Sequence, residues 1–188
     1  MSKTILITGA SGSLGSQLRL LLKNDYTIIG TSRKLYLSDD IKWFQITSTH
    51  DTPKIIEETN PDIIIHTAFV NQKPKNISDT KYLNQINLEN YRIFKKASEV
   101  NSHILLVSSS AVYGWQNEIE SIDESALKCP VSLYGIGKVN QEILLEYFGR
   151  VFGLKYVIIR PFNIVGPGQN QNTLFYEWIK KVISLEKK

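Results

Sequence analysis

Tyr134 and Lys138 are four residues apart, and Ser109 lies 25 residues before the tyrosine. Four residues make about one helical turn, so the phenol and the ammonium would share one helix face, and a hydroxyl from a separate strand could lie beside both. A free tyrosine titrates near pH 10, and a nearby ammonium lowers that pKa by about 1–3 units. The three residues therefore predict proton transfer to or from an alcohol or a ketone near neutral pH.

The same spacing occurs in two other places, Tyr91/Lys95 and Tyr176/Lys180. Only the pair at Tyr134 follows both a serine-rich strand end and a glycine-rich first loop. We therefore assign the chemistry to that pair and interpret the other two as residues of amphipathic helices.

A glycine-rich segment, Thr8-Gly9-Ala10-Ser11-Gly12-Ser13-Leu14-Gly15, follows the first apolar run and precedes the first helical pattern. Gly9 would allow a tight turn, Gly12 a close approach of the backbone to a pyrophosphate, and Gly15 close packing of helix on strand. The start of a helix offers free N–H groups and a partial positive charge to phosphates. We expect a dinucleotide to bind along this loop, at Gly9, Ser11, Gly12, Ser13, Leu14 and Gly15.

The end of the second apolar run should select the cofactor. It reads Ser32-Arg33 where an acidic residue would favour NAD. An arginine there would form charge-assisted hydrogen bonds with a 2′-phosphate, so we predict NADP, with NAD as second choice. The alternative is a solvated Arg33. Gln45 and Ile46 close the third run, where an adenine would lie, although a plain strand end fits as well.

Short apolar runs alternate with longer helical patterns along the chain. Several runs are continuously apolar, such as Ile63-Ile64-Ile65, which is typical of strands buried on both faces of a parallel sheet. The alternation predicts an α/β fold with a doubly wound, Rossmann-type parallel sheet. We expect strands at 4–8, 26–30, 41–46, 62–66, 103–108 and 156–160, and helices at 13–24, 52–59, 80–100, 133–152 and 173–184.

Composition narrows the class of protein further. The chain has 188 residues, a net charge of +4 and 42% hydrophobic residues, which fits one globular domain. The single cysteine, Cys129, excludes an internal disulfide and fits the cytoplasm. No apolar run approaches a membrane span, no basic stripe predicts nucleic-acid binding, and no residue spacing predicts a metal site.

Taken together, these residues resemble the extended short-chain dehydrogenase/reductase family, in the branch that acts on nucleotide-activated sugars. The resemblance extends over nearly the whole chain. It is carried by the glycine loop, His66-Thr67-Ala68, Asn87-Leu88-Glu89-Asn90, Ser109–Gly114, Pro130–Lys138 and Arg160–Gln169.

The resemblance implies hydride transfer between a nicotinamide and a sugar carbon, coupled to proton transfer by Tyr134. It implies a catalytic set of Ser109, Tyr134, Lys138 and Asn87, cofactor contacts at Ala68, Tyr134, Lys138 and Pro161, and substrate contacts at Ser110 and Asn163. Family dimers suggest a homodimer through helices 80–100 and 133–152. Family members also continue into a smaller substrate domain. We therefore expect a dinucleotide-binding domain at residues 1–170, the start of a truncated substrate domain at 171–188, and poor turnover by this short chain.

Sugar dehydratases of the family carry an Asp-Glu pair where this chain has Ser110-Ala111, which argues against dehydration. A nucleotide-sugar epimerase or 4-ketoreductase remains. Two alternatives stay open: an NADP-dependent reductase of other aldehydes or ketones, and a non-catalytic NADP-binding regulator or fragment.

Overall fold

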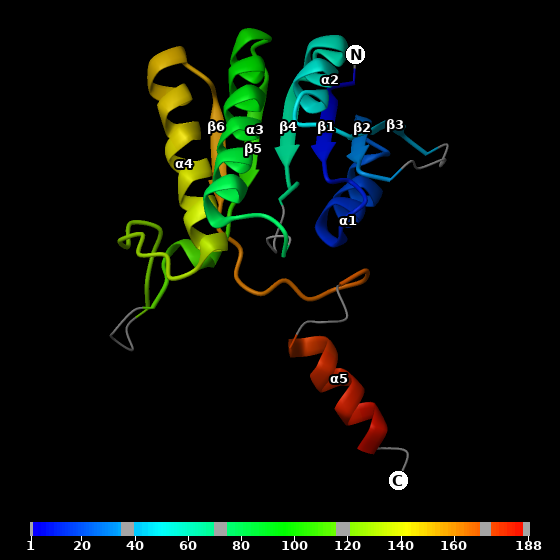
Figure 1. The fold of residues 1–188 in the computed structure, drawn as a ribbon. Coiled ribbons are helices and arrows are strands. Elements are labelled where there is room, and N and C mark those ends of the chain that lie inside the picture. The colour runs from blue at the N-terminus through cyan, green and yellow to red at the C-terminus, as the bar shows by residue number, and fades with distance from the viewer. Residues whose placement is uncertain (1, 35–39, 70–74, 116–120, 170–173, 186–188) are drawn as a thin grey trace.

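In the computed structural model, which describes residues 2–34, 40–69, 75–115, 121–169 and 174–185, six parallel strands form one sheet in the order β3-β2-β1-β4-β5-β6 (Figure 1). The strands are β1 (Thr4–Thr8), β2 (Thr27–Ser32), β3 (Lys42–Gln45), β4 (Ile63–His66), β5 (His103–Val107) and β6 (Tyr156–Ile159). The strand order turns back between β1 and β4, which confirms the predicted Rossmann-type sheet.

Helices cover both faces of this sheet. They are α1 (Ser13–Leu22), α2 (Asp51–Thr59), α3 (Asp79–Glu99) and α4 (Leu133–Phe152). A short 3-10 helix η1 (Ser110–Val112) follows β5, and a last helix, α5 (Leu174–Leu185), follows β6. Every predicted helix and strand is present, and their ends differ from the predicted ones by at most two residues.

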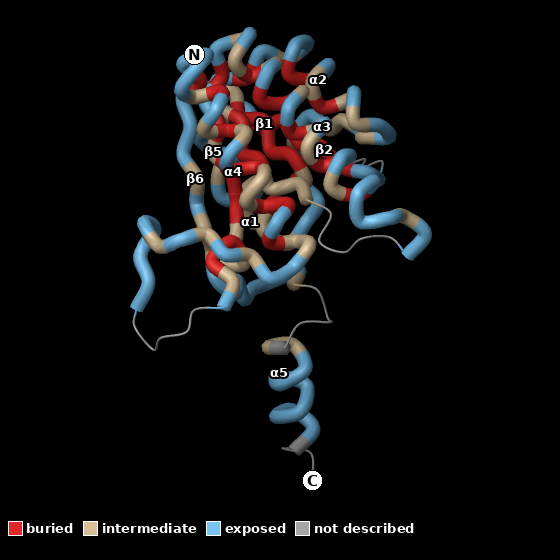
Figure 2. Tube along the Cα trace, turned by 60° about the vertical axis from the view of Figure 1, so that its left-hand side comes forward, coloured by how far each residue is buried: buried red, intermediate tan, exposed pale blue. Residues whose placement is uncertain are grey.

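Successive strand residues face opposite layers, which gives the fold two cores. Leu6 and Ile64 pack in one cluster with Phe94 of α3 and Phe148 of α4. Ile5, Ile7 and Ile65 pack in the other cluster, together with Leu18 and Leu22 of α1. The central strands are therefore covered on both sides, as the buried interior in Figure 2 shows.

Helix ends are set by local residues. The Ser78 hydroxyl accepts a hydrogen bond from Lys81 N and begins α3, and the Ser132 hydroxyl accepts one from Gly135 N and begins α4. Helix α4 ends at Gly153, whose φ of 70° is left-handed and favours glycine. These residues set where α3 begins and where α4 begins and ends.

Helix α5 lies apart from the sheet and its helices in both Figure 1 and Figure 2. The domain boundary predicted at 170/171 lies outside the described residues, so residues 1–170 and 171–188 remain predicted units. No helix among the described residues is long and apolar enough to span a membrane.

Candidate active site

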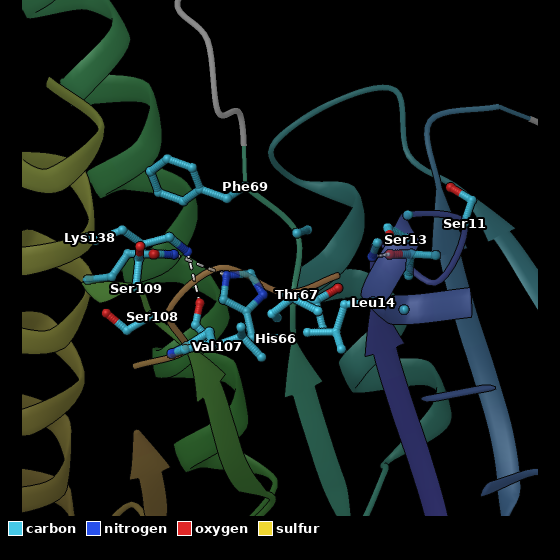
Figure 3. A pocket seen from close by; sticks show the side chains of 18 of the residues that line it. Ser11, Ser13, Leu14, His66, Thr67, Phe69, Val107, Ser108, Ser109 and Lys138 are labelled. Atoms are coloured by element: carbon cyan, nitrogen blue, oxygen red, sulfur yellow. Dashed lines mark hydrogen bonds between the residues drawn. The ribbon is translucent and has the colours of Figure 1, made fainter. Parts of the chain in front are cut away.

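A cavity of about 640 Å³ runs along the carboxyl ends of the strands. The glycine loop and the ends of β2 and β3 line one side of it, and the end of β5, the first turns of α4 and the segment after β6 line the other. Figure 3 shows Ser11 and Ser13 at one end and Ser109, Lys138 and Phe69 at the other. This is the crevice in which open parallel sheets bind ligands.

The loop between β1 and α1 has the conformation that a pyrophosphate site needs. Gly9 has a φ of 69°, and a Cβ on Gly15 would lie only 2.3 Å from Gly9 O. Gly12 caps α1 without a side-chain hydrogen bond, so the first N–H groups of the helix stay open to a ligand. All six residues predicted along this loop line the cavity: Gly9, Ser11, Gly12, Ser13, Leu14 and Gly15. The loop therefore fits a dinucleotide.

Ser32, Arg33 and Ile46 line the same end of the cavity, as predicted for an adenosine site. The Ser32 hydroxyl donates to Ser11 Oγ at 3.0 Å, which ties β2 to the glycine loop. Gln45, in contrast, is exposed and does not line the cavity, because its side-chain amide donates to Arg33 O at 3.3 Å. A role for Gln45 at the adenine remains a prediction.

Tyr134, Lys138 and Ser109 line the opposite end of the cavity. Lys138 is 3% exposed, and its Nζ donates to Val107 O at 2.9 Å and lies 5.9 Å from the centroid of the Tyr134 ring. Ser109 precedes η1, and its hydroxyl accepts from Ala111 N at 3.2 Å. The end of β5 thus places Ser109, and helix α4 places Tyr134 and Lys138, at the same end of the cavity.

Burial changes the electrostatics of this end of the cavity. It lowers the pKa of Lys138 to about 7, although the negative charge of Glu142 acts in the opposite direction. The lysine is therefore charged in only part of the molecules near neutral pH. The spacing of Tyr134 and Lys138 could not predict this shift of the lysine pKa, because desolvation depends on the packed fold.

Phe69 is a cavity residue that the sequence analysis missed. Its ring centroid is 4.1 Å from Lys138 Nζ and 5.1 Å from the Tyr134 ring centroid, in an edge-to-face arrangement. Gly137 leaves room for it, since a Cβ there would lie 3.0 Å from Phe69 Cζ. The signal available in the sequence was an aromatic residue three positions after the end of the fourth strand, beside the crevice.

A buried polar network lies beneath Lys138. Thr8 Oγ1 is 2.8 Å from His66 Nδ1, His66 Nε2 is 3.0 Å from Asn90 Oδ1, and Gln141 Nε2 donates to Asn90 Oδ1 at 2.7 Å. Because Asn90 Oδ1 only accepts, His66 must donate from Nε2 and accept from Thr8 at Nδ1. Burial, reinforced by the Lys138 charge, lowers the pKa of His66 to about 4. His66 is thus a packed histidine at the end of β4, with a hydrogen-bond partner at each ring nitrogen.

Glu142 anchors α4 one turn beyond Lys138. It is fully buried, and both of its oxygens accept from the Arg160 guanidinium, at 3.0 and 2.9 Å. Lys128 Nζ lies 2.8 Å from Glu142 Oε2, and the Ser108 hydroxyl donates to Oε1. These partners lower the pKa of Glu142 against the effect of burial. The cluster connects β5, α4 and the end of β6.

Some of the other predicted site residues line the cavity, and others lie outside it. Ala68, Pro161 and Asn163 line the cavity. Asn87 and Ser110 do not: Asn87 Oδ1 accepts from Asn140 Nδ2 at 3.3 Å between α3 and α4, and Ser110 N donates to Pro161 O at 3.0 Å. Their catalytic and substrate roles remain predictions. The pairs Tyr91/Lys95 and Tyr176/Lys180 lie outside the cavity as well.

A glycine loop that opens onto the carboxyl ends of a parallel sheet defines a dinucleotide-binding domain. Comparison with known proteins narrows this class. Residues 5–187 match the NAD dependent epimerase/dehydratase family, and the chain belongs to that family.

Curated relatives are enzymes of nucleotide-sugar metabolism. The chain is 29% identical over 187 residues to a GDP-6-deoxy-D-talose 4-dehydrogenase from Aggregatibacter actinomycetemcomitans, covering 97% of this chain and 60% of the relative. It is 25% identical over 174 residues to a UDP-glucose 4-epimerase from Streptococcus mutans, covering 86% of this chain and 52% of the relative. The chain thus spans little more than half the length of these relatives.

A solved structure of similar fold is that of a UDP-glucuronic acid 4-epimerase from Bacillus cereus in complex with NAD. The TM-score is 0.82 at 22% identity, covering 96% of this chain and 63% of the epimerase. At this identity the likeness shows the fold, and it confirms the doubly wound sheet.

Proposed function

We propose that this chain is the dinucleotide-binding and catalytic part of a nicotinamide-dependent nucleotide-sugar epimerase or 4-ketoreductase. The observation that carries the proposal is that Ser109, Tyr134 and Lys138 line the same cavity as the glycine loop. A cofactor along the loop and a proton donor at the far end meet in one crevice. The relatives supply the substrate class, because they are named as epimerases, dehydrogenases and reductases of nucleotide sugars.

When bound, the nicotinamide ring would give or accept a hydride at the sugar carbon. Tyr134 would transfer the matching proton at the oxygen of that carbon, and Ser109 would hold this oxygen by a hydrogen bond. Lys138, held by Val107 O, would orient the nicotinamide ribose and favour the ionised phenol when it is protonated. Phe69 would exclude water from the lysine side of the reaction.

Two positions favour epimerisation or reduction over dehydration. Dehydration would need an acid and a base after the active hydroxyl, and the chain has Ser110-Ala111 there. Asn163 lines the cavity and would contact the sugar or its phosphates. Reduction of a simpler aldehyde or ketone is the second candidate, and the intact Tyr134/Lys138 pair favours both over a non-catalytic cofactor-binding regulator.

For the cofactor we propose first a nicotinamide dinucleotide, and second a preference for NADP over NAD. The family description and the neighbouring structure with NAD support a nicotinamide dinucleotide. The finer proposal, NADP before NAD, is supported only by Arg33 at the adenosine end of the cavity.

A homodimer is a further part of the proposal. Apolar side chains remain exposed on one face of α3 and α4, including Leu88, Tyr91, Ile143, Tyr147 and Val151. A two-fold contact between these helices would bury them. Tyr147→Glu should reduce the molar mass measured by light scattering from that of a dimer to that of a monomer.

The direct test measures binding and turnover separately. Isothermal titration should show a nicotinamide dinucleotide binding to both the wild type and Tyr134→Phe. Single-turnover hydride transfer to a 4-keto nucleotide sugar should occur only with the wild type. Equal transfer by Tyr134→Phe would refute Tyr134 as the proton donor, and absence of dinucleotide binding would refute the proposed function as a whole.

A further inference from the structure

Glu89 faces the adenosine end of the cavity from α3, and the proposed function gives it no role. It lies one turn before Arg92, whose Nη1 donates to Thr49 Oγ1 at 2.9 Å, and two turns before Lys96, whose Nζ pairs with Glu57 of α2 at 2.9 Å. These contacts turn this face of α3 towards α2 and the residues just before it. The neighbouring Asn90 also lines the cavity, but its side chain is held in the His66 network.

The lining of the cavity places Glu89 with the cofactor-selecting residues. Ser32 and Arg33 from β2, Ile46 after β3 and Thr52 of α2 line the cavity together with Glu89. The residue that selects the adenosine ribose lies at the end of the second strand of such a sheet, so Arg33 and its neighbours mark the adenosine end of the cavity. Glu89 from α3 and Arg33 from the end of β2 would therefore both reach the adenosine.

Glu89 is available for a ligand. Within the described ranges, neither its carboxylate nor the Arg33 guanidinium is held by a hydrogen bond or an ion pair. Burial raises the pKa of Glu89, and the positive charge of Arg33 acts against that rise. A half-buried carboxylate of this kind gains from a hydroxyl that donates to it.

The two side chains would read the adenosine ribose with opposite preferences. A carboxylate accepts hydrogen bonds from a free 2′-hydroxyl but repels a 2′-phosphate, whereas a guanidinium binds the phosphate. We propose that Glu89 is a specificity-determining residue, which accepts from the unphosphorylated adenosine ribose and limits the preference for NADP that Arg33 confers. This inference rests on the proposed function, because it requires a nicotinamide dinucleotide in the cavity.

The test compares dissociation constants for NAD and NADP by isothermal titration in the wild type, Glu89→Gln, Arg33→Gln and the control Glu99→Gln. Glu99 lies on the same helix and pairs with Lys96 away from the cavity. Glu89→Gln keeps the shape and removes the charge, so the affinity ratio should shift towards NADP by about tenfold or more. Arg33→Gln should shift the ratio towards NAD. Glu89→Asp keeps the carboxylate and should therefore retain most of the wild-type ratio, and Glu99→Gln should leave the ratio unchanged.

The same comparison with adenosine 5′-monophosphate and adenosine 2′,5′-bisphosphate removes the nicotinamide half and should give the same direction of shift. An unchanged ratio in Glu89→Gln, or an equal loss of affinity for both cofactors, would overturn the role of Glu89 while leaving the proposed function intact. Failure of the wild type to bind either dinucleotide would instead overturn the proposed function, and this inference with it.

Discussion

The Lys138 ammonium lies 4.1 Å from the centroid of the Phe69 ring, and this ring also meets the Tyr134 ring edge-on at 5.1 Å. Phe69 acts on the lysine in two opposing ways. Its bulk keeps water away and lowers the pKa of Lys138, while its π face stabilises the charged form by about 1–2 kcal/mol. Burial lowers that pKa from 10.5 to about 7, so desolvation is the larger effect.

Two substitutions of Phe69 should therefore move the pKa of Lys138 in opposite directions. Phe69→Ala admits water, and the pKa should rise from about 7 towards its ordinary value. Phe69→Leu retains the apolar cover and removes the π face, so the pKa should fall slightly. NMR titration of the lysine Cε–Hε signal, assigned with Lys138→Met, measures both. A shift in the same direction for the two variants would contradict this account.

Lys138→Met should make the fold more stable while it removes catalysis. A buried amine with a folded-state pKa below its unfolded value binds protons less readily when folded, so the native state loses stability below about pH 10. Methionine avoids this cost but leaves Val107 O without its donor, which costs about 1 kcal/mol. We expect a net gain of about 1–2 kcal/mol at pH 7 in urea denaturation. A less stable variant would show that the lysine is not strained by burial.

Glu142→Gln should be among the most destabilising single changes in this domain. It leaves the Arg160 guanidinium and the Lys128 ammonium without their buried counter-charge, a loss of about 3–5 kcal/mol. Glu146 is the matched control on the same helix, because it pairs with Lys128 and Arg150 but is partly exposed. Glu146→Gln should cost under about 1 kcal/mol. Similar midpoints of chemical unfolding for both variants would speak against a stabilising role of the buried cluster.

The glycines of the first loop should separate binding from folding. A Cβ on Gly15 would lie 2.3 Å from Gly9 O. Gly15→Ala should therefore lower the free energy of unfolding by about 2 kcal/mol or more. A Cβ on Gly12 would meet Gly9 O at 3.2 Å and otherwise faces the cavity. Gly12→Ala should keep a melting temperature near that of the wild type and weaken dinucleotide binding at least about tenfold. Calorimetric melting and titration distinguish the two effects.

Acid should weaken the fold through His66. Its pKa is about 4 when folded and 6.5 ordinarily, so the unfolded chain takes up the proton first as the pH falls. Stability from this group is complete above about pH 6.5 and declines towards pH 4, by up to about 3 kcal/mol. His66→Gln should flatten the pH dependence of the unfolding free energy in this window. An unchanged pH dependence in His66→Gln would contradict this account.

The backbone of the site was predictable, and its buried polar groups were not. Continuous apolar runs such as Ile63–Ile65 located the strands, and the order of glycine loop, serine strand end and Tyr134/Lys138 located the ends of the cavity. Phe69, Gln141 and Glu142 were missed because their roles depend on which distant side chains they meet in the fold. Sequence spacing cannot show that Glu142 meets Arg160, or that Asn87 contacts Asn140 between helices and not the cavity.

Among the described strands, β6 lies at one edge of the sheet and pairs only with β5. The side chains of Val157 and Ile159 on β6 are exposed. A strand so thinly covered should be the first of the sheet to exchange its amide hydrogens. Yet Ile159 O accepts from Ser108 N and Pro161 O from Ser110 N, on either side of Ser109. Fraying of β6 would therefore also release Ser109, the serine proposed to hold the substrate oxygen. Local opening of the strand and loss of the proposed reactive geometry would then be one thermodynamic event. Occupancy of the crevice should in turn protect β6 from deuterium.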